Sequence, residues 1–247
     1  MTNPLTEIYR DQWLLAVHKP AGLLVHRSPI DPHEMEFALQ YAREMNGGEY
    51  VYAVHRLDRP TSGLLLFARD QQTASTVGKA LMASEVRKKY IAMVRGWAPD
   101  EGVIDHALRE EPEDGRRKDE EAPVRAALTR YRRVATTEIP VAIEGYQSSR
   151  YSLVELFPET GRRHQLRRHM KHISHPIIGD ANHGRGRHNR YFAERFGQGR
   201  LMLAATAMSF AHPVTGERLE LAAPLEASFM QVLSIFGDGL PELRLGF

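Results

Sequence analysis

The run from His55 to Gly63 concentrates residue types that can do chemistry. One carboxylate, Asp58, lies between the guanidinium groups of Arg56 and Arg59. Flanking positive charge favours the ionised carboxylate, which is the form that acts as a base or a nucleophile. Pro and Gly residues close the run into a loop, and loops held by a sheet are common mounts for catalytic groups. The alternative is an ordinary turn aspartate that hydrogen-bonds its own backbone amides.

A second concentration of functional side chains runs from Arg162 to Arg200. It contains ten Lys or Arg, only two acids and six His, and 27 of the 33 basic residues of the chain are Arg. Arg offers a planar fork of donors that suits phosphate groups, so this stretch favours nucleic acid as a partner. Segment 99–121 has the reverse balance, with ten acids and four bases. The formal net charge of +2 therefore conceals separate basic and acidic surfaces.

The histidines of the basic stretch raise the alternative of a metal site. His164, His169, His172 and His175 are spaced closely enough to share a helix face. Zinc sites normally need a defined ligand set, often with Glu or Asp, but this run has no H-E-x-x-H motif and no acid before Asp180. Interleaved Arg and Lys repel cations and attract phosphates. We therefore expect no metal, and the absence of cysteine excludes disulfides and thiolate ligands.

The elements that position these residues are expected to form one sheet with helices around it. Apolar runs at 13–17 and 23–26, separated by a Lys-Pro-Ala-Gly turn, predict a hairpin. The other expected strands are 51–54, 63–68, 90–94, 127–135, 151–157, 201–205 and 218–221. The expected helices start at Asp31, at Gln71 after an Asp70 cap, near Arg163 and near Leu225. This pattern lacks a regular βαβ alternation and favours an α+β fold with a largely antiparallel sheet.

Length and composition set the class of protein. The 247 residues are 42% hydrophobic and 26% charged, which is typical of a globular chain with a substantial core. We expect a single domain over residues 1–247. The longest apolar runs are far shorter than the ~18 residues of a membrane span, and no signal-peptide pattern is present. We therefore expect a cytoplasmic protein that does not insert into membranes.

The loop from His55 to Gly63 resembles the catalytic loop of RluA-type pseudouridine synthases. Other blocks of the family follow the same order along the chain: Val17–Gly22, Lys88–Tyr90, Thr160–Arg167, Arg200–Leu203 and His212–Gly216. His18 and Ala204 depart from the pattern, where Asn and His are usual. The resemblance implies the pseudouridine synthase fold, with a mixed sheet, flanking helices and a central RNA-binding cleft. It also implies that an N-terminal S4-like RNA-binding domain is missing.

The resemblance implies that the chain isomerises uridine to pseudouridine in RNA without a cofactor. It gives Asp58 the role of essential carboxylate, Tyr90 that of a ring stacked on uracil, and Arg162 that of the cation paired with Asp58. Arg56 would fill the gap left by the flipped base, and Leu203 would form an apolar wall. RNA contacts are expected from a further group of basic residues, Arg59, Arg163, Arg167, Arg168 and Lys171.

Within the family, the sequence is most similar to members that act on tRNA, which implies uridine 65 in the T stem. We expect a monomer that uses no nucleotide cofactor. Two alternatives remain open at this point: the same reaction on ribosomal RNA, and a non-catalytic RNA-binding protein. The order of the chemical steps and the role of segment 99–121 do not follow from the sequence.

Overall fold

The computed structural model describes residues 3–27, 33–111, 121–197 and 199–247. The strands are β1 (Thr6–Arg10), β2 (Leu14–Lys19), β3 (Tyr52–Ala53), β4 (Ser62–Ala68), β5 (Arg87–Arg95), β6 (Glu101–Asp105), β7 (Leu108–Arg109), β8 (Val124–Arg125), β9 (Leu128–Ile139), β10 (Ser149–Pro158), β11 (Leu203–Ala211) and β12 (Arg218–Ala222). The helices are α1 (Ala38–Met45), α2 (Gln71–Met82), α3 (Gln165–His172), α4 (Gly186–Phe196) and α5 (Ala227–Leu233), followed by the 3₁₀ helix η1 (Ser234–Gly239).

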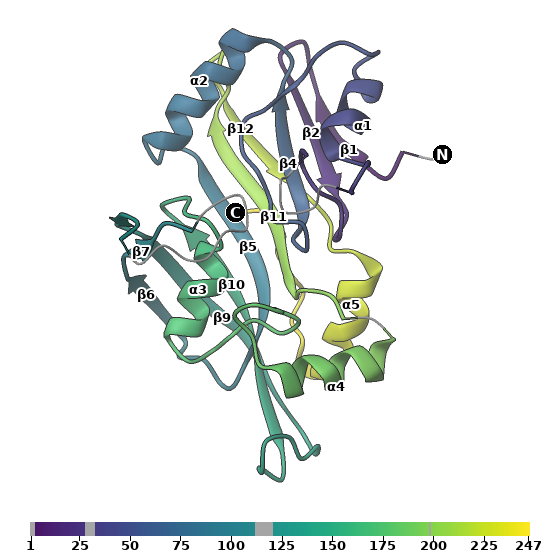
Figure 1. The fold of residues 1–247 in the computed structure, drawn as a ribbon, viewed down its shortest axis with the longest axis vertical. Coiled ribbons are helices and arrows are strands. Elements are labelled where there is room, and N and C mark those ends of the chain that lie inside the picture. Colours follow the sequence, from purple (N-terminus) through teal and green to yellow (C-terminus); the bar gives the residue numbers. More distant parts are fainter. Residues whose placement is uncertain (1–2, 28–32, 112–120, 198) are drawn as a thin grey trace.

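Ten of these strands form one sheet. Its order is β1-β2-β4-β11-β5-β10-β9-β6, with β12 beside β11 and β3 beside β4, while β7 and β8 pair separately. Neighbouring strands are antiparallel except β4 and β11, which run parallel. Figure 1 shows the N-terminal strands with α1 and α2 in its upper half, and β9 and β10 with α3 in its lower half. The predicted α+β class with a largely antiparallel mixed sheet is confirmed.

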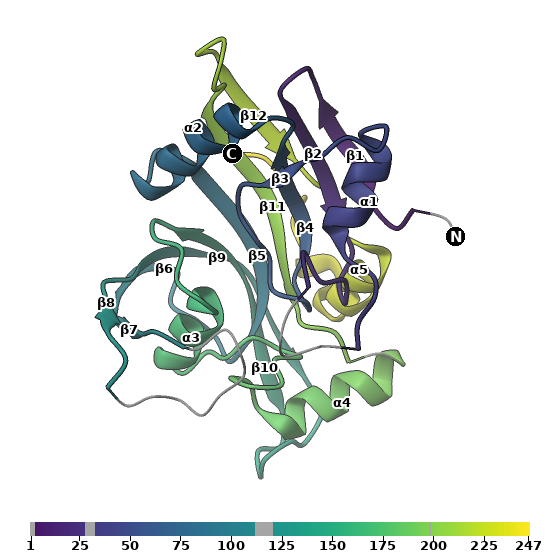
Figure 2. The same ribbon diagram turned by 45° about the horizontal axis from the view of Figure 1, so that its top comes forward.

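The sheet is covered on both faces where the N-terminal strands meet. Leu65 and Phe67 of β4 pack in an apolar cluster with α1, whereas Leu64 and Leu66 pack in another cluster with α2. Burial on both faces explains why β4 is a continuous apolar run instead of an alternating one. Figure 2 shows the two helices on either side of these strands. A third cluster packs α3, α4 and α5 against β5 and β10 and includes Met93, Leu153, Met170, Phe192 and Phe229.

Gly63 lets the segment that follows Asp58 enter the sheet. Its φ is +108°, and a Cβ at this position would lie 2.0 Å from the carbonyl oxygen of Ala205. Only glycine fits both requirements, because a side chain is disfavoured at this φ and has no space. The Ser62–Gly63 end of β4 therefore pairs in parallel with Ala204–Ala205 of β11. This pairing fixes the end of the Asp58 loop on the central strand.

Several predicted elements differ in detail. The strand expected at 23–26 does not form, and β2 pairs instead with β1, which the sequence pattern did not indicate. The buried ammonium of Lys19 binds the carbonyl oxygens of Pro20 and Leu23 at 2.9 and 2.8 Å, which curls this segment into a turn. The helix expected from Asp31 begins at Ala38, and Asp31 itself lies outside the described residues.

The starts of the other helices can be compared with the predicted ones. The cap predicted at Asp70 is confirmed, since its carboxylate accepts a hydrogen bond from the amide of Thr73. The basic helix begins at Gln165 and not at Arg163, because His164 has a left-handed backbone with φ of 51°. Helix α4 carries part of the basic stretch that runs to Arg200. None of the helices among the described residues has the length and apolar character needed to span a bilayer.

Candidate active site

Asp58 lies in a loop that is fixed by backbone hydrogen bonds. The amide of Thr61 donates to the carbonyl oxygen of Asp58 at 3.0 Å, and the amide of Gly22 donates to the carbonyl oxygen of Arg59 at 2.9 Å. Lys19 adds a bond from its Nζ to the same Arg59 oxygen at 3.2 Å. These bonds hold the loop through its main chain, so the carboxylate of Asp58 is available for contacts with other segments.

The carboxylate of Asp58 pairs with Arg167 of α3. The Nη1 of Arg167 donates to Oδ2 of Asp58 at 3.1 Å, while its Nε and Nη2 donate to the two carboxylate oxygens of Asp180 at 2.7 and 2.8 Å. Arg167 and Asp180 are 4% and 1% exposed, so this bidentate pair is shielded from water. The amides of Asn182 and His183 also donate to Asp180. Asp58, Arg167 and Asp180 thus form one continuous chain of charges.

The protonation states within this chain are fixed by the pairing. Burial by itself would raise the pKa of Asp180, but hydrogen bonds from Arg167 and from backbone amides hold that pKa below its ordinary value. Burial likewise opposes the charge on Arg167, yet its hydrogen bonds to Asp180 and the two neighbouring carboxylates raise its pKa. Both residues therefore remain charged across the physiological pH range.

Two of the predicted roles require correction. Arg162 does not pair with Asp58: its Nε donates to the carbonyl oxygen of Ala126 at 3.0 Å, because the residue lies before the helix and outside its buried face. Arg167 takes the place predicted for Arg162. Arg167 was itself expected to contact phosphate, whereas in the structure its guanidinium is buried and hydrogen-bonds the carboxylates of Asp58 and Asp180.

The start of α3 explains how Arg167 reaches this position. The Nε2 of Gln165 donates to the carbonyl oxygen of Leu128 and to the hydroxyl of Thr129, both at 3.0 Å, and its Oε1 accepts from Arg162 and Thr160. A buried glutamine therefore fastens the first turn of the helix to β9. Two residues later, Arg167 faces the Asp58 loop instead of solvent.

A cavity of about 1170 Å³ opens beside Asp58. Tyr90 and Lys88 of β5 and Leu203 of β11 line it, together with Arg167. Burial, and then the negative charge of Asp58, raises the pKa of Tyr90, so its hydroxyl stays protonated. The cavity thus brings together a carboxylate, a neutral phenol ring and an apolar wall, which suits a flat, polar ring as occupant.

The remaining basic residues of the prediction are spread around this cavity. Arg56 and Arg163 line it, and Arg59 also lines it while forming an exposed ion pair with Glu34 at 2.8 Å. Arg168 donates to the carbonyl oxygen of Arg109 at 2.9 Å on the neighbouring segment. Lys171 is exposed on α3 and is not part of the cavity wall.

Two residues of the site, Asp180 and Lys88, were given no role from the sequence. Asp180 was noted only as an acid in a basic stretch, and no local pattern connects it with Arg167. Lys88 could have been found by strand alternation, since Lys88 and Tyr90 lie on one face of β5 and Lys89 lies on the other. Lys89 pairs there with the buried Glu155 at 2.7 Å.

The two departures from the family pattern lie in buried strand positions. His18 of β2 is 9% exposed, and its Nε2 has no hydrogen-bond partner among the described residues. Ala204 of β11 is 1% exposed and pairs with Ser62 and with Ile91. Neither side chain touches the Asp58–Arg167 pair, so the departures leave that geometry intact.

Known proteins resemble this chain over most of its length. Residues 13–172 match the family described as RNA pseudouridylate synthase. The tRNA pseudouridine synthase C of Vibrio cholerae is 47% identical over 234 residues, which is 93% of this chain and 95% of that protein. The tRNA pseudouridine synthase C of Yersinia pestis is 47% identical over 233 residues, covering 93% of this chain and 90% of that protein.

A solved structure resembles the fold. The human RNA Pseudouridylate Synthase Domain Containing 4 superimposes with a TM-score of 0.68 at 25% sequence identity, covering 93% of this chain and 92% of that one.

Proposed function

The chain belongs to the RNA pseudouridylate synthase family, and we propose that it isomerises a uridine of tRNA to pseudouridine with Asp58 as the essential carboxylate. The observation that carries the proposal is the buried chain from Asp180 through Arg167 to Asp58 at the wall of a cavity. Binding RNA requires no such arrangement, whereas a reaction requires a carboxylate held in one position and one charge state.

The reaction breaks the N1–C1′ bond of uridine and forms a C5–C1′ bond. The proton lost from C5 is balanced by one gained at N1, so the reaction is redox-neutral. A base inside a helix cannot reach Asp58, and we propose that the target uridine is flipped into the cavity, which costs a few kcal/mol of stacking and pairing. Asp58 then acts on the sugar or the base while Arg167 holds the carboxylate ionised and oriented.

We assign the other cavity residues to the flipped nucleotide. Tyr90 stacks on the uracil, and its protonated hydroxyl is a hydrogen-bond donor near the reacting ring. Leu203, which is 3% exposed, forms the apolar wall. Arg56 fills the space that the base leaves in the RNA helix. Lys88 lies half-buried on the cavity wall, and we assign it to the phosphate of the flipped nucleotide.

The surface outside the cavity would hold the RNA backbone. Arg163, Arg168 and Lys171 remain assigned to phosphate contacts, as does Arg59 at the edge of the catalytic loop. Uridine 65 in the T stem is the proposed target, and a tRNA substrate places the reaction in the cytoplasm. We propose that the protein acts as a monomer.

The test uses tRNA carrying tritium at C5 of uridine. Wild-type protein should release tritium, whereas Asp58→Asn should release none while binding tRNA with unchanged affinity. Release by Asp58→Asn at the wild-type rate would remove Asp58 from its role. Mapping pseudouridine in total RNA from cells with and without the gene identifies the target. Loss of a pseudouridine only from ribosomal RNA would refute the tRNA assignment, and no change in any RNA would refute catalysis.

A further inference from the structure

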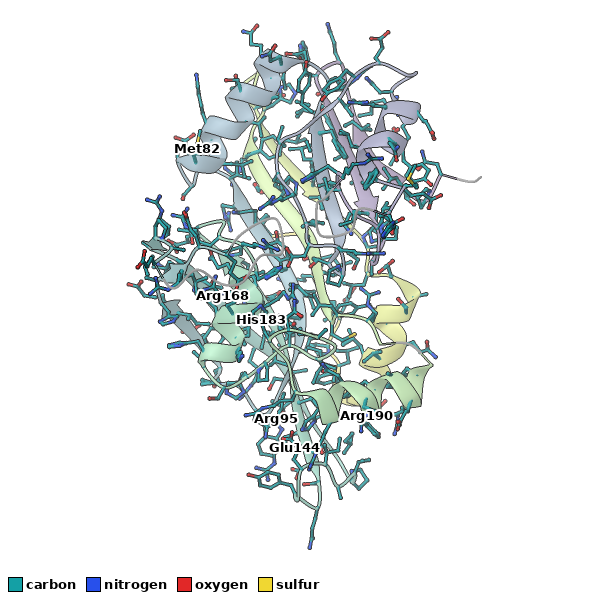
Figure 3. All side chains as sticks on the ribbon, viewed as in Figure 1. Met82, Arg95, Glu144, Arg168, His183 and Arg190 are labelled. Carbon is teal, nitrogen blue, oxygen red and sulfur yellow. The ribbon has the colours of Figure 1, made fainter. Side chains whose placement is uncertain are left out.

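Three metal-ligating side chains meet beside the cavity. Glu111 follows β7, His164 precedes α3 and His183 lies in the loop after Asp180, and one ligand atom of each lies within 4.8 Å of the others. The Nδ1 of His164 is already 3.0 Å from Oε2 of Glu111. The rings of His164 and His183 face each other edge to face, with centroids 5.5 Å apart. Figure 3 places His183 near the middle of the molecule.

The side chain of His183 supplies an independent indication of a ligand. The residue is 8% exposed, and its Nε2 is buried without a hydrogen-bond partner among the described residues. A buried nitrogen left without a partner is energetically unfavourable. Glu111 and His164 are also largely shielded, with side chains 12% and 14% exposed. Glu111, His164 and His183, here called the triad, therefore form a semi-enclosed cluster with an unsatisfied donor or acceptor and are not a set of surface residues.

The three side chains are of the types that bind zinc. Open zinc sites use three such His or carboxylate ligands with a water in the fourth position. Tetrahedral bonds of about 2.0–2.1 Å separate ligand atoms by about 3.3 Å, so only a small inward shift is needed.

The charges around the triad balance. Asp58, Asp180 and Glu111 contribute carboxylates, and Oδ2 of Asp58 is 3.9 Å from Nε2 of His164. Arg167 is neutralised by its two carboxylate partners. Arg168 lies 3.9 Å from Glu111 and Arg163 lies next to His164, which offsets the remaining negative charge. The site thus lacks the strong positive field that would exclude a divalent cation.

We propose that Glu111, His164 and His183 bind one divalent transition-metal ion of the zinc class beside the Asp58 cavity. The ion would tie the segment after β7 to the start of α3 and to the loop after Asp180. This site shares only His164 with the histidine set considered in the sequence. His169 is engaged with Thr129 and with the carbonyl oxygen of His106, and His175 with the carbonyl oxygen of Arg95.

The test measures metal binding directly. Protein stripped with a chelator is titrated with Zn²⁺ by calorimetry and with Co²⁺ by its visible absorption, which reports tetrahedral coordination. Wild type should bind one ion per chain. His183→Ala should lose more affinity than the roughly 10- to 100-fold expected for an outer-shell partner. Glu111→Gln should also weaken binding, and this variant provides the test if His183→Ala does not fold.

His172→Ala is the matched control, since His172 lies exposed on α3 and outside the triad. It should bind zinc like wild type. Asp58→Asn should also retain binding, which separates this site from the proposed reaction. The proposal is wrong if wild type shows no saturable binding of one ion per chain, or if both Glu111→Gln and a folded His183→Ala bind as tightly as wild type. Loss of binding in Asp58→Asn would overturn the assignment of three protein ligands.

Discussion

Arg167 connects the buried carboxylate of Asp180 to the carboxylate of Asp58, and its removal should affect stability and turnover separately. In Arg167→Gln the carboxylate of Asp180, which is 1% exposed, loses the bidentate pair at 2.7 and 2.8 Å. Removing one partner of a buried ion pair costs about 3–5 kcal/mol of unfolding free energy. For a chain of this size that lowers Tm by roughly 6–20 °C.

The loss of turnover in Arg167→Gln should differ in size from the loss of stability, and a second substitution that restores stability should not restore turnover. The bond from Arg167 to Asp58 at 3.1 Å is a charged hydrogen bond, for which about 1.5–3 kcal/mol is typical. If this stabilisation is exerted in the transition state, turnover falls roughly 10- to 150-fold. The double variant Arg167→Gln with Asp180→Asn removes the buried charge, so stability should recover while turnover stays low.

The assay is tritium release under single-turnover conditions, with thermal unfolding measured on the same samples. Arg168→Gln is the matched control, because Arg168 is the next residue and its side chain is 17% exposed at the surface of α3. It should weaken tRNA binding and leave the rate at saturation unchanged. If turnover recovers together with stability in the double variant, Arg167 only supports the fold. If Arg167→Gln behaves like Arg168→Gln, Arg167 is a phosphate contact after all.

Two further predictions concern charge. Lys88→Gln should raise KM for tRNA and should make the plot of log binding constant against log salt concentration shallower by about 0.7–0.9. Lys79→Gln, at an exposed position, should change neither quantity. Equal salt slopes for Lys88→Gln and wild type would contradict the phosphate contact. In a chelator, unfolding free energy should decrease from pH 6.5 to about 4 by up to about 1.4 kcal/mol per pH unit, because buried His183 has a lowered pKa of about 4 and gains a proton on unfolding. Urea unfolding of His183→Gln should show a shallower decrease, and an unchanged slope would assign it to other groups.

The sequence was sufficient to predict features that depend only on residues close together along the chain. Asp70 caps α2 because its carboxylate reaches an amide three residues on, and this geometry follows from spacing alone. The loop of Asp58 between two apolar runs was likewise visible, since its Pro and Gly residues mark a turn. The hairpin expected around Lys19 failed because the ammonium is buried and binds carbonyl oxygens, including that of Arg59, 40 residues away. A turn motif alone does not reveal such a partner.

The amino-acid sequence by itself determined the fold class, the catalytic-loop signature and the basic character of the helix that faces it. Four arginines lie within the seven residues from Arg162 to Arg168, and composition does not distinguish among them. Only the docking of α3 on β9 through Gln165 decided that Arg167 turns inward to Asp58 and Asp180 while Arg162 remains outside. The physical reason is that charge and helix formation are local properties, whereas the choice of partner depends on which face of a helix the rest of the chain buries.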